Sequence, residues 1–582
     1  MKHPLPANFL LRIAIALLAC SCGGQHAQRD TVRIRWARDP ETLDPLFAPN
    51  LAAFDANNLL HVSLLQGDIA TQQLAPALAE QLPTVQLVGD SLTRLQYRIR
   101  PAATWDNGRA VLASDVDFTL KLMLCPGLPN EAARNQYSFI RAVLPHPQDP
   151  RRFTLLCRGQ SLEFAQASGD FFILPEHSLD PRGLLRRWSL ADLQRQPLPL
   201  PADSGARAVA QQYLAAVASR SSNRLSGCGP YELLKWEKDR FLSFRRKPRW
   251  WGSRLQPAPL VLQARPQQLE YVIIPDVATA ALALQRGDVD VFPQMPAREF
   301  ARLRAAPAAR SALRFYTSPS YDVATAGFNT RHPALADALT RRALSRCFDA
   351  AGLLRATQLG EGQRTVGIIS PADRANYNDS LAPVPFAPDS AVALLRRAGW
   401  QRRSAPHEGW FRSTGRGADQ QLRLLVRYRA EEVLFGTVAL QFQAAAASIG
   451  VPVTLRPTEP GTFATAMRSG DFDVYLRVLR GNPFMFNFTQ LLHSASANNV
   501  TKFGTPASDR LIAAIARADN PARRTALLRQ FQALLQAEAP IVPLFYLPNR
   551  VAANRALTGL HVGSLRPGFA AATIERVAQP AP

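Results

Sequence analysis

The sequence predicts an α/β fold made of two similar lobes, and a repeated helix-to-strand step is the main observation behind this prediction. A helical stretch at 276–285 is followed by Gly287-Asp288-Val289-Asp290-Val291, and another at 463–469 is followed by Gly470-Asp471-Phe472-Asp473-Val474. In both, the glycine ends the helix and an aspartate-flanked apolar alternation begins a strand. Helical and strand patterns also alternate along the whole chain without a long linker, so both lobes are expected to be α/β.

The remaining elements follow from the spacing of apolar residues. Period-two alternation predicts strands at 32–36, 95–99, 153–157, 231–236, 241–245, 422–428 and 451–455. Amphipathic spacing predicts helices at 207–219, 389–398 and 521–537. Asp519 and Asn520 can cap the last of these helices, and Pro521 suits its first turn.

The composition is that of a globular protein. Of the 582 residues, 47% are hydrophobic and 19% are charged, a balance that excludes a mostly disordered chain. Beyond the first twenty residues there is no apolar run of about 18, which excludes several membrane spans. The net charge is +23, yet its arginines are scattered, whereas nucleic-acid binders cluster their basic residues. We therefore expect no nucleic acid among the partners.

The N-terminus predicts export and a lipid anchor. Lys2 and Arg12 precede a short apolar core, and Leu17-Leu18-Ala19-Cys20 fits the bacterial lipobox, in which the cysteine is lipidated. We expect a signal peptide at 1–19, lipidation of Cys20 and a flexible tether at 20–30. The alternative is an ordinary signal cleaved near Cys22 or Gly24. In either case the protein is expected outside the cytoplasm, in the periplasm or on the cell surface.

The body of the chain contains four cysteines, Cys125, Cys157, Cys228 and Cys347. They form no CxxC pair and have no neighbouring histidine, so no metal site is expected. In an oxidising compartment a disulfide between Cys125 and Cys157 would close the segment between them. Four buried thiols are the equally weighted alternative.

No motif in the sequence predicts catalysis. The histidines are isolated from one another, and the aspartate pairs of the two repeated steps stand at strand entries. Gly89-Asp90-Ser91-Leu92 matches the tetrapeptide of one lipase class, but it lies between two strand patterns and is interpreted as a hairpin turn. We therefore predict a protein that is not an enzyme and needs no cofactor.

A series of short motifs stands in order along the chain. They include Asp39-Pro40-Glu41-Thr42-Leu43-Asp44-Pro45, Leu74-Ala75-Pro76-Ala77-Leu78-Ala79-Glu80, Thr104-Trp105-Asp106-Asn107-Gly108, Leu174-Pro175-Glu176-His177, Gly227-Cys228-Gly229-Pro230-Tyr231, Phe328-Asn329-Thr330 and Ala539-Pro540-Ile541-Val542-Pro543-Leu544. Each motif is weak alone, and the ordered set is specific. In this order the motifs resemble the bacterial extracellular solute-binding proteins of family 5, the oligopeptide, dipeptide and nickel class.

The resemblance implies a periplasmic-binding-protein-like type II fold, with two α/β lobes that close over a ligand about a hinge. By order it places lobe I at 31–65, 225–312 and 545–582, an extra domain of lobe I at 66–224, and lobe II at 313–544. The hinge is expected near 316–328 and 540–546. The resemblance also implies a monomer that delivers its ligand to the permease subunits of an ABC importer. The alternative is a lipoprotein of the same fold that acts as a sensor or assembly factor.

The expected pocket loop departs from the peptide-binding pattern of the family. There, an aspartate after the Gly-Asp-x-Asp strand pairs with the ligand's amino terminus. Here the loop has Arg477 and Arg480 and no acid. Arginine repels a cation and favours a carboxylate or phosphate. The sequence therefore predicts an acidic, blocked or sugar-like ligand rather than a standard peptide zwitterion, unless the arginines are surface or inter-lobe ion-pair residues.

The candidate ligand-binding residues come from four segments of the chain. Three candidates lie in or next to the opening loop, two lie at the lobe crossing, one precedes the second repeated step, and the remaining six form the expected pocket loop. Trp36, in the first group, is either a residue that stacks on the ligand or a core aromatic. The candidates are Trp36, Arg38, Glu41, Tyr321, Asp322, Glu459, Arg477, Val478, Leu479, Arg480, Gly481 and Asn482.

Overall fold

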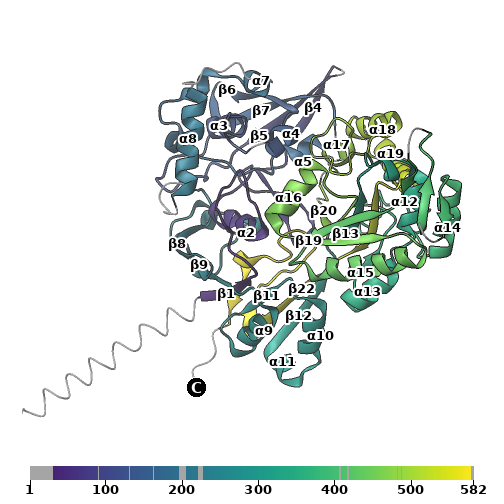
Figure 1. Cartoon of the computed structure of the whole chain (residues 1–582). Coiled ribbons are helices and arrows are strands. Elements are labelled where there is room, and N and C mark those ends of the chain that lie inside the picture. Colours follow the sequence, from purple (N-terminus) through teal and green to yellow (C-terminus); the bar gives the residue numbers. More distant parts are fainter. Residues whose placement is uncertain are drawn as a thin grey trace, which may run out of the picture.

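The structure is a computed structural model, and it describes residues 31–577 except 90, 130, 162, 196–204, 220–226, 405–407, 416–417, 482, 485, 487 and 519. Figure 1 shows three packed parts, each with its own sheet. The expected signal peptide at 1–19, the tether at 20–30 and Cys20 lie outside the described residues.

The first sheet has seven strands in the order β12-β22-β11-β1-β10-β9-β8. Strands β1, β10 and β11 run parallel to one another, and the outer strands are antiparallel. Tyr271 and Phe244 pack in the core beside β1. The strands are β1 Thr31–Trp36, β8 Tyr231–Glu237, β9 Phe241–Arg246, β10 Gln268–Ile273, β11 Val291–Pro293, β12 Leu313–Ser318 and β22 Asn549–Asn554, and the helices are α2 Leu51–Leu60, α9 Val277–Arg286, α10 Ala297–Ala305 and α11 Pro307–Ala312.

The second sheet has six strands in the order β14-β21-β13-β20-β18-β19. Strand β18 is parallel to β19 and β20, whereas β13 is antiparallel to β20 and β21. The strands are β13 Asp322–Phe328, β14 Gln363–Arg364, β18 Leu424–Arg429, β19 Val453–Thr458, β20 Val474–Arg480 and β21 Ile541–Tyr546. The helices are α12 Ala338–Ser345, α13 Ala350–Gln358, α14 Pro388–Arg397, α15 Val433–Ser448, α16 Pro460–Ser469, α17 Phe488–Leu492, α18 Pro506–Ala516 and α19 Pro521–Glu538.

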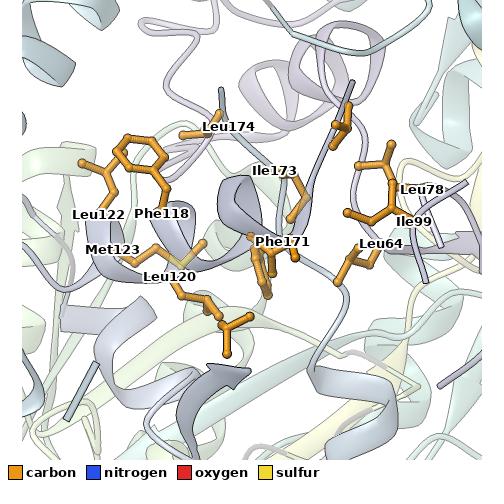
Figure 2. Close-up of a cluster of buried hydrophobic side chains, with 14 of the residues drawn as sticks. Leu64, Leu78, Ile99, Phe118, Leu120, Leu122, Met123, Phe171, Ile173 and Leu174 are labelled. Atoms are coloured by element: carbon orange, nitrogen blue, oxygen red, sulfur yellow. The ribbon is translucent and has the colours of Figure 1, made fainter. Parts of the chain in front are cut away.

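The third part is a four-stranded antiparallel sheet in the order β4-β5-β7-β6, packed with helices around its own core. Figure 2 shows side chains of this core, with Phe118, Leu122 and Met123 of α3 on one side of Phe171 and Leu64, Leu78 and Ile99 on the other. The strands are β4 Thr84–Val88, β5 Leu92–Arg98, β6 Ile140–His146 and β7 Asp149–Arg158, and the helices are α3 Ala113–Met123, α4 Glu131–Gln136, α5 Phe164–Ala167, α6 Glu176–Leu179, α7 Leu190–Gln194 and α8 Gly205–Ala218.

Small sheets complete the fold. One joins β15 Gln401–Arg403, β16 Gly409–Arg412 and β17 Gln420–Gln421, a second joins β2 Leu65–Asp68 to β3 Gln73–Pro76, and a third joins β23 Leu557–Thr558 to β24 Glu575–Arg576.

The chain passes between the two large sheets at two places that touch each other. It crosses from β12 to β13 and returns from β21 to β22. The backbone N–H of Leu547 donates to the carbonyl of Asp322 at 2.8 Å, and the hydroxyl of Ser320 donates to the carbonyl of Leu547. Because β12 pairs with β22, the sheet changes after Ser318, whereas the resemblance places the boundary at 313, before this strand.

The repeated helix-to-strand steps are present. Gly287 and Gly470 follow α9 and α16 in the left-handed conformation, with φ of 80° and 78°. Glycine adopts this conformation without a Cβ penalty, which explains why both helices end there. Strands β11 and β20 begin at Val291 and Val474, so the aspartates precede the strands rather than belong to them. Asn520 caps α19 as predicted, by accepting from the backbone N–H of Arg523.

The structure corrects the disulfide prediction. Cys125 and Cys157 are separate buried thiols, as are Cys228 and Cys347, so the alternative of four buried thiols holds. Burial raises the pKa of each thiol to about 12. A thiol with such a pKa is almost entirely protonated near neutrality and reacts poorly.

Two other observations concern the lipase-like tetrapeptide around Ser91 and membrane-spanning helices. The hairpin turn predicted around Ser91 is confirmed, because β4 pairs antiparallel with β5 and Ser91 is exposed between them. Within the described part of the chain, no helix is both long and apolar enough to cross a bilayer.

Candidate functional site

The two large sheets turn the ends of their parallel strands toward a common region. Strand β1 ends at Trp36, and the loop after it carries Arg38. Strands β18 and β20 run in parallel and end at Arg429 and Arg480. Arg38 forms an ion pair with Glu431, just after β18, at 3.3 Å, so these strand ends face each other. Loops beyond the carboxyl ends of parallel strands are the usual ligand site of open α/β sheets.

Charged groups from both lobes line this region. Arg566, from the loop before β24, pairs with Asp322 at 2.8 Å. Arg429 lies 3.5 Å from Glu432 and 3.9 Å from Glu431. Because all these side chains are partly exposed, each pair contributes only about 0.2–1 kcal/mol. Only two of these pairs, Arg38–Glu431 and Arg566–Asp322, join different lobes, and they hold the lobes together weakly.

Arg480 differs from its neighbours in having an accessible and unengaged charge. It is exposed at the end of β20, opposite Asp322 in the strand pairing. The surrounding protein and then the charge of Arg566 lower the pKa of its guanidinium, with Asp322 and Glu432 opposing. Among the described residues, no ion pair or hydrogen bond engages its side chain.

Arg477 lies on the opposite face of β20 and does not join Arg480. Its guanidinium lies over the ring of Tyr475 at 4.8 Å, and its Nε is buried without a hydrogen-bond partner within the described chain. The hydroxyl of Thr325 donates to its carbonyl at 3.0 Å. Alternate residues of a strand point to opposite faces, so three positions separate these arginines onto different sides. Of the two predicted contacts, only Arg480 faces the inter-lobe region.

The rest of the predicted loop is divided between two cores and a tight contact. Val478 packs with the core of the six-stranded sheet, and Leu479 packs against the cluster around Phe488. The backbone N–H of Gly481 donates to the carbonyl of Tyr321 at 2.9 Å, and a Cβ at Gly481 would lie 2.6 Å from that oxygen. Asn482 lies outside the described residues.

Trp36 is a core aromatic, the second of the two interpretations of this residue. Its ring stacks on Tyr271 with centroids 4.0 Å apart, and its exposed fraction is 5%. Its Nε1–H donates to Asp55 at 3.3 Å. Glu41 is exposed with φ of 66°, and Glu459 is exposed at the start of α16. Neither contacts the arginines around Asp322 in any described ion pair.

Asp55 on α2 belongs to the same region and was not predicted from the sequence. Burial raises the pKa of its carboxyl group to about 8, while the Trp36 hydrogen bond and the charge of Arg566 oppose the shift. Its Oδ1 is buried with no hydrogen-bond partner in the described structure. Arg566 was missed as well. It comes from a C-terminal loop with no motif, so only the folded structure brings it to Asp322.

The extra domain meets lobe II through a second cluster. Glu163 forms an ion pair with Arg524 of α19, and the backbone N–H of Phe486 donates to Glu163 at 3.3 Å. A cavity of about 70 Å³ adjoins this contact, large enough for water. It is lined by Glu163, Phe486, Phe488, Thr489, Ile512, Ile515 and Ala516.

No group of three or more His, Cys, Asp or Glu side chains in the described residues is arranged to hold a metal ion. The guanidinium of Arg480 can offer charge-assisted and bidentate hydrogen bonds to an anion. Closure of the two lobes would surround such an anion from both sides.

Comparison with known proteins places this geometry in a family. Residues 73–499 match the bacterial extracellular solute-binding proteins, family 5 Middle. The chain is 26% identical to Protein XP55 of Streptomyces lividans over 528 residues, covering 89% of this chain and 83% of that protein. It is 21% identical to the dipeptide-binding protein of Escherichia coli K12 over 560 residues, covering 93% of each.

A solved structure shows the same fold. The periplasmic EDTA-binding protein EppA superposes with a TM-score of 0.77 at 18% identity, covering 94% of this chain and 97% of that one. Together with the two facing sheets, the likeness identifies the two-lobe type II binding-protein fold. The chain belongs to the bacterial extracellular solute-binding proteins of family 5.

Proposed function

We propose that this protein is an extracytoplasmic solute-binding protein, held to a membrane by lipid on Cys20, that captures a small ligand between its lobes and delivers it to an ABC permease. Family membership supports capture and delivery. The lobes are joined by two short crossings, which suits a hinge motion. The lipobox at 17–20 supports the anchor.

The ligand is proposed to carry an anionic group and no free α-amino group. The exposed, unengaged guanidinium of Arg480 is the single observation behind this proposal. A carboxylate or phosphate would gain charge-assisted hydrogen bonds there, worth about 1.5–3 kcal/mol. An ammonium group would be repelled by Arg480 and by its neighbour Arg566. The relatives include both a dipeptide-binding and an EDTA-binding protein, so the family accommodates ligands of either kind.

Native mass spectrometry of the gently purified exported protein tests the ligand class. A retained molecule is released by denaturation and identified. An acidic, blocked or sugar-acid molecule is the expected result. A peptide with a free amino terminus would show that the inference from Arg480 is wrong. An empty protein that shows no thermal shift with peptide, sugar or anion panels would favour a non-transport lipoprotein.

Matched variants test whether Arg480 binds the ligand. Arg480→Gln should weaken binding of the identified ligand by roughly 10- to 100-fold, the equivalent of one charge-assisted contact. Arg423→Gln is the control, because Arg423 precedes β18 and therefore lies at the opposite end of the same sheet. Equal ligand affinities for the two variants would show that Arg480 does not contact the ligand.

The anchor needs its own experiment. Cys20→Ser should move the protein from the membrane fraction to the soluble extracytoplasmic fraction, whereas Cys22→Ser should leave it with the membrane. The same distribution for both variants would favour an ordinary cleaved signal.

A further inference from the structure

The contact between the extra domain and lobe II is buried, unlike the ion pairs beside Arg480. The side chains of Glu163 and Arg524 are only 13% and 15% exposed. The guanidinium of Arg524 also lies over the ring of Phe486 at 5.1 Å, and Phe486 donates its backbone N–H to Glu163. Glu163 of the extra domain therefore contacts both Arg524 and Phe486 of lobe II, which also contact each other. We call these three residues the clasp.

Opening the lobes must break the clasp, because its members belong to parts with separate cores. Glu163 directly precedes α5 of the extra domain, and Arg524 lies on α19 of lobe II. Figure 1 shows α5 beside α17, and the ion pair connects the start of α5 to α19. Removing one partner of a buried pair leaves an uncompensated charge, so the closed arrangement depends on both.

The clasp lies a short distance along the chain from Arg480. Phe486 follows Arg480 by six positions, and six residues span at most about 20 Å when fully extended. The real separation is shorter, because Leu479 and Phe486 pack against one hydrophobic cluster. A fully extended peptide of nine residues would span about 30 Å. Such a peptide, if held at Arg480 and running toward Phe486, would extend past the clasp.

We propose that the clasp closes one end of the ligand cleft and so restricts this protein to ligands short enough to lie between Arg480 and Phe486. This inference rests on the proposed function, since it assumes that the anionic group binds at Arg480. It adds a size limit to the ligand class. Glu163 and Arg524 act as positioning residues that hold the end of the cleft shut.

Closure is measured without any ligand. Spin labels at Gln211→Cys on α8 and Arg510→Cys on α18, both exposed, report the distance between the extra domain and lobe II. Glu163→Arg should lengthen and broaden the distance distribution. The swap Glu163→Arg with Arg524→Glu should restore it, and Arg529→Glu, on the same helix but paired with Asp379 inside lobe II, should leave it unchanged. An unchanged distribution in Glu163→Arg would overturn the clasp.

The size limit is measured with N-acetyl-aspartate and with N-acetyl-aspartate extended by one or six alanines, using calorimetry. The wild-type protein should bind the longest probe at least tenfold more weakly than the shorter two. Glu163→Ala with Arg524→Ala should reduce that difference to less than threefold. Equal wild-type affinities would overturn the size limit. If no probe binds at any length, the ligand class is wrong, and the labelled pair still decides whether the clasp closes the cleft.

Discussion

Arg566 and Asp322 pair at 2.8 Å across the two lobes, and the charges of both act on the guanidinium of Arg480 with opposite effects on its pKa. Asp322 also lies opposite Arg480 in the pairing of β13 with β20. The carboxylate thus pairs with Arg566 and acts on Arg480, from the other lobe, through its charge alone. While Arg566 holds it, Arg480 keeps its charge available for an anion.

Substitutions in this pair should therefore shift anion affinity in opposite directions. Arg566→Gln frees Asp322 to neutralise Arg480 and should weaken binding of an anionic ligand. Asp322→Asn removes the competing negative charge and should strengthen it. Each change should be about two- to fivefold, since the pair is one-third exposed. Titration calorimetry measures both, with Arg265→Gln, whose pair with Glu575 lies within lobe I, as the control. Shifts of the same sign would contradict the sharing of Asp322.

Asp55 should make stability fall as pH rises. The folded-state pKa of its carboxyl group is about 8, and that of an unfolded aspartate is about 3.9. A raised carboxyl pKa means that the folded state binds the extra proton. Its contribution is fully present below pH 4 and is lost as pH rises toward 8. Each unit of difference corresponds to about 1.4 kcal/mol, so the effect is large.

Asp55→Asn tests this dependence, because the amide keeps the shape of the neutral acid. Denaturant unfolding between pH 5 and pH 8.5 should show a smaller loss of stability in the variant than in the wild type, and the variant should be the more stable at the upper end. Asp276→Asn is the control. Asp276 is an exposed cap whose pKa is lowered by its hydrogen bonds to Thr279, so its contribution has the opposite sign. Parallel curves for wild type and Asp55→Asn would refute the prediction.

The local elements could be predicted from sequence because they depend on neighbouring residues. The glycine stop at Gly470 and the Asn520 cap need only a few consecutive positions, and both are present. Strand β12 was assigned to the wrong side of the boundary, because its partner β22 lies more than 200 positions away. Pairing over such a separation leaves no local pattern.

The position of a candidate site residue could be predicted only where strand alternation and loop position sufficed. Arg480 ends its strand on the side of the other lobe, and its role in ligand binding stays a prediction. Arg477 was grouped with it by closeness in sequence, but alternation turns it toward Tyr475. Arg566, Asp55 and the clasp come from distant segments. Their roles depend on charge and burial in the folded chain, which composition cannot reveal.

Labelling of the four buried thiols tests the corrected disulfide prediction. Without reductant, a thiol reagent should label Cys125, Cys157, Cys228 and Cys347 only after denaturation, because each is buried with a pKa of about 12. Peptide mapping by mass spectrometry counts them. Finding Cys125 and Cys157 unlabelled in denaturant, and linked in one peptide pair, would restore the disulfide.

Gly481 should be required for closure because a backbone atom occupies the space that a side chain would need. A Cβ would lie 2.6 Å from the carbonyl oxygen of Tyr321, an atom of the crossing that cannot rotate away. Gly481→Ala should therefore displace β20 from that crossing, and we expect ligand affinity to fall by roughly tenfold or more, consistent with the 1–3 kcal/mol typical of overpacking.

Gly461→Ala is the matched control for this substitution. Gly461 lies in α16 of the same lobe, and a Cβ there meets nothing within 4 Å. Alanine in a helix is favoured over glycine by up to about 1 kcal/mol, so this variant should be slightly more stable and bind normally. Thermal unfolding and calorimetry on both variants separate the effects. If Gly481→Ala binds as well as Gly461→Ala, the contact between Gly481 and Tyr321 does not couple the pocket loop to the crossing.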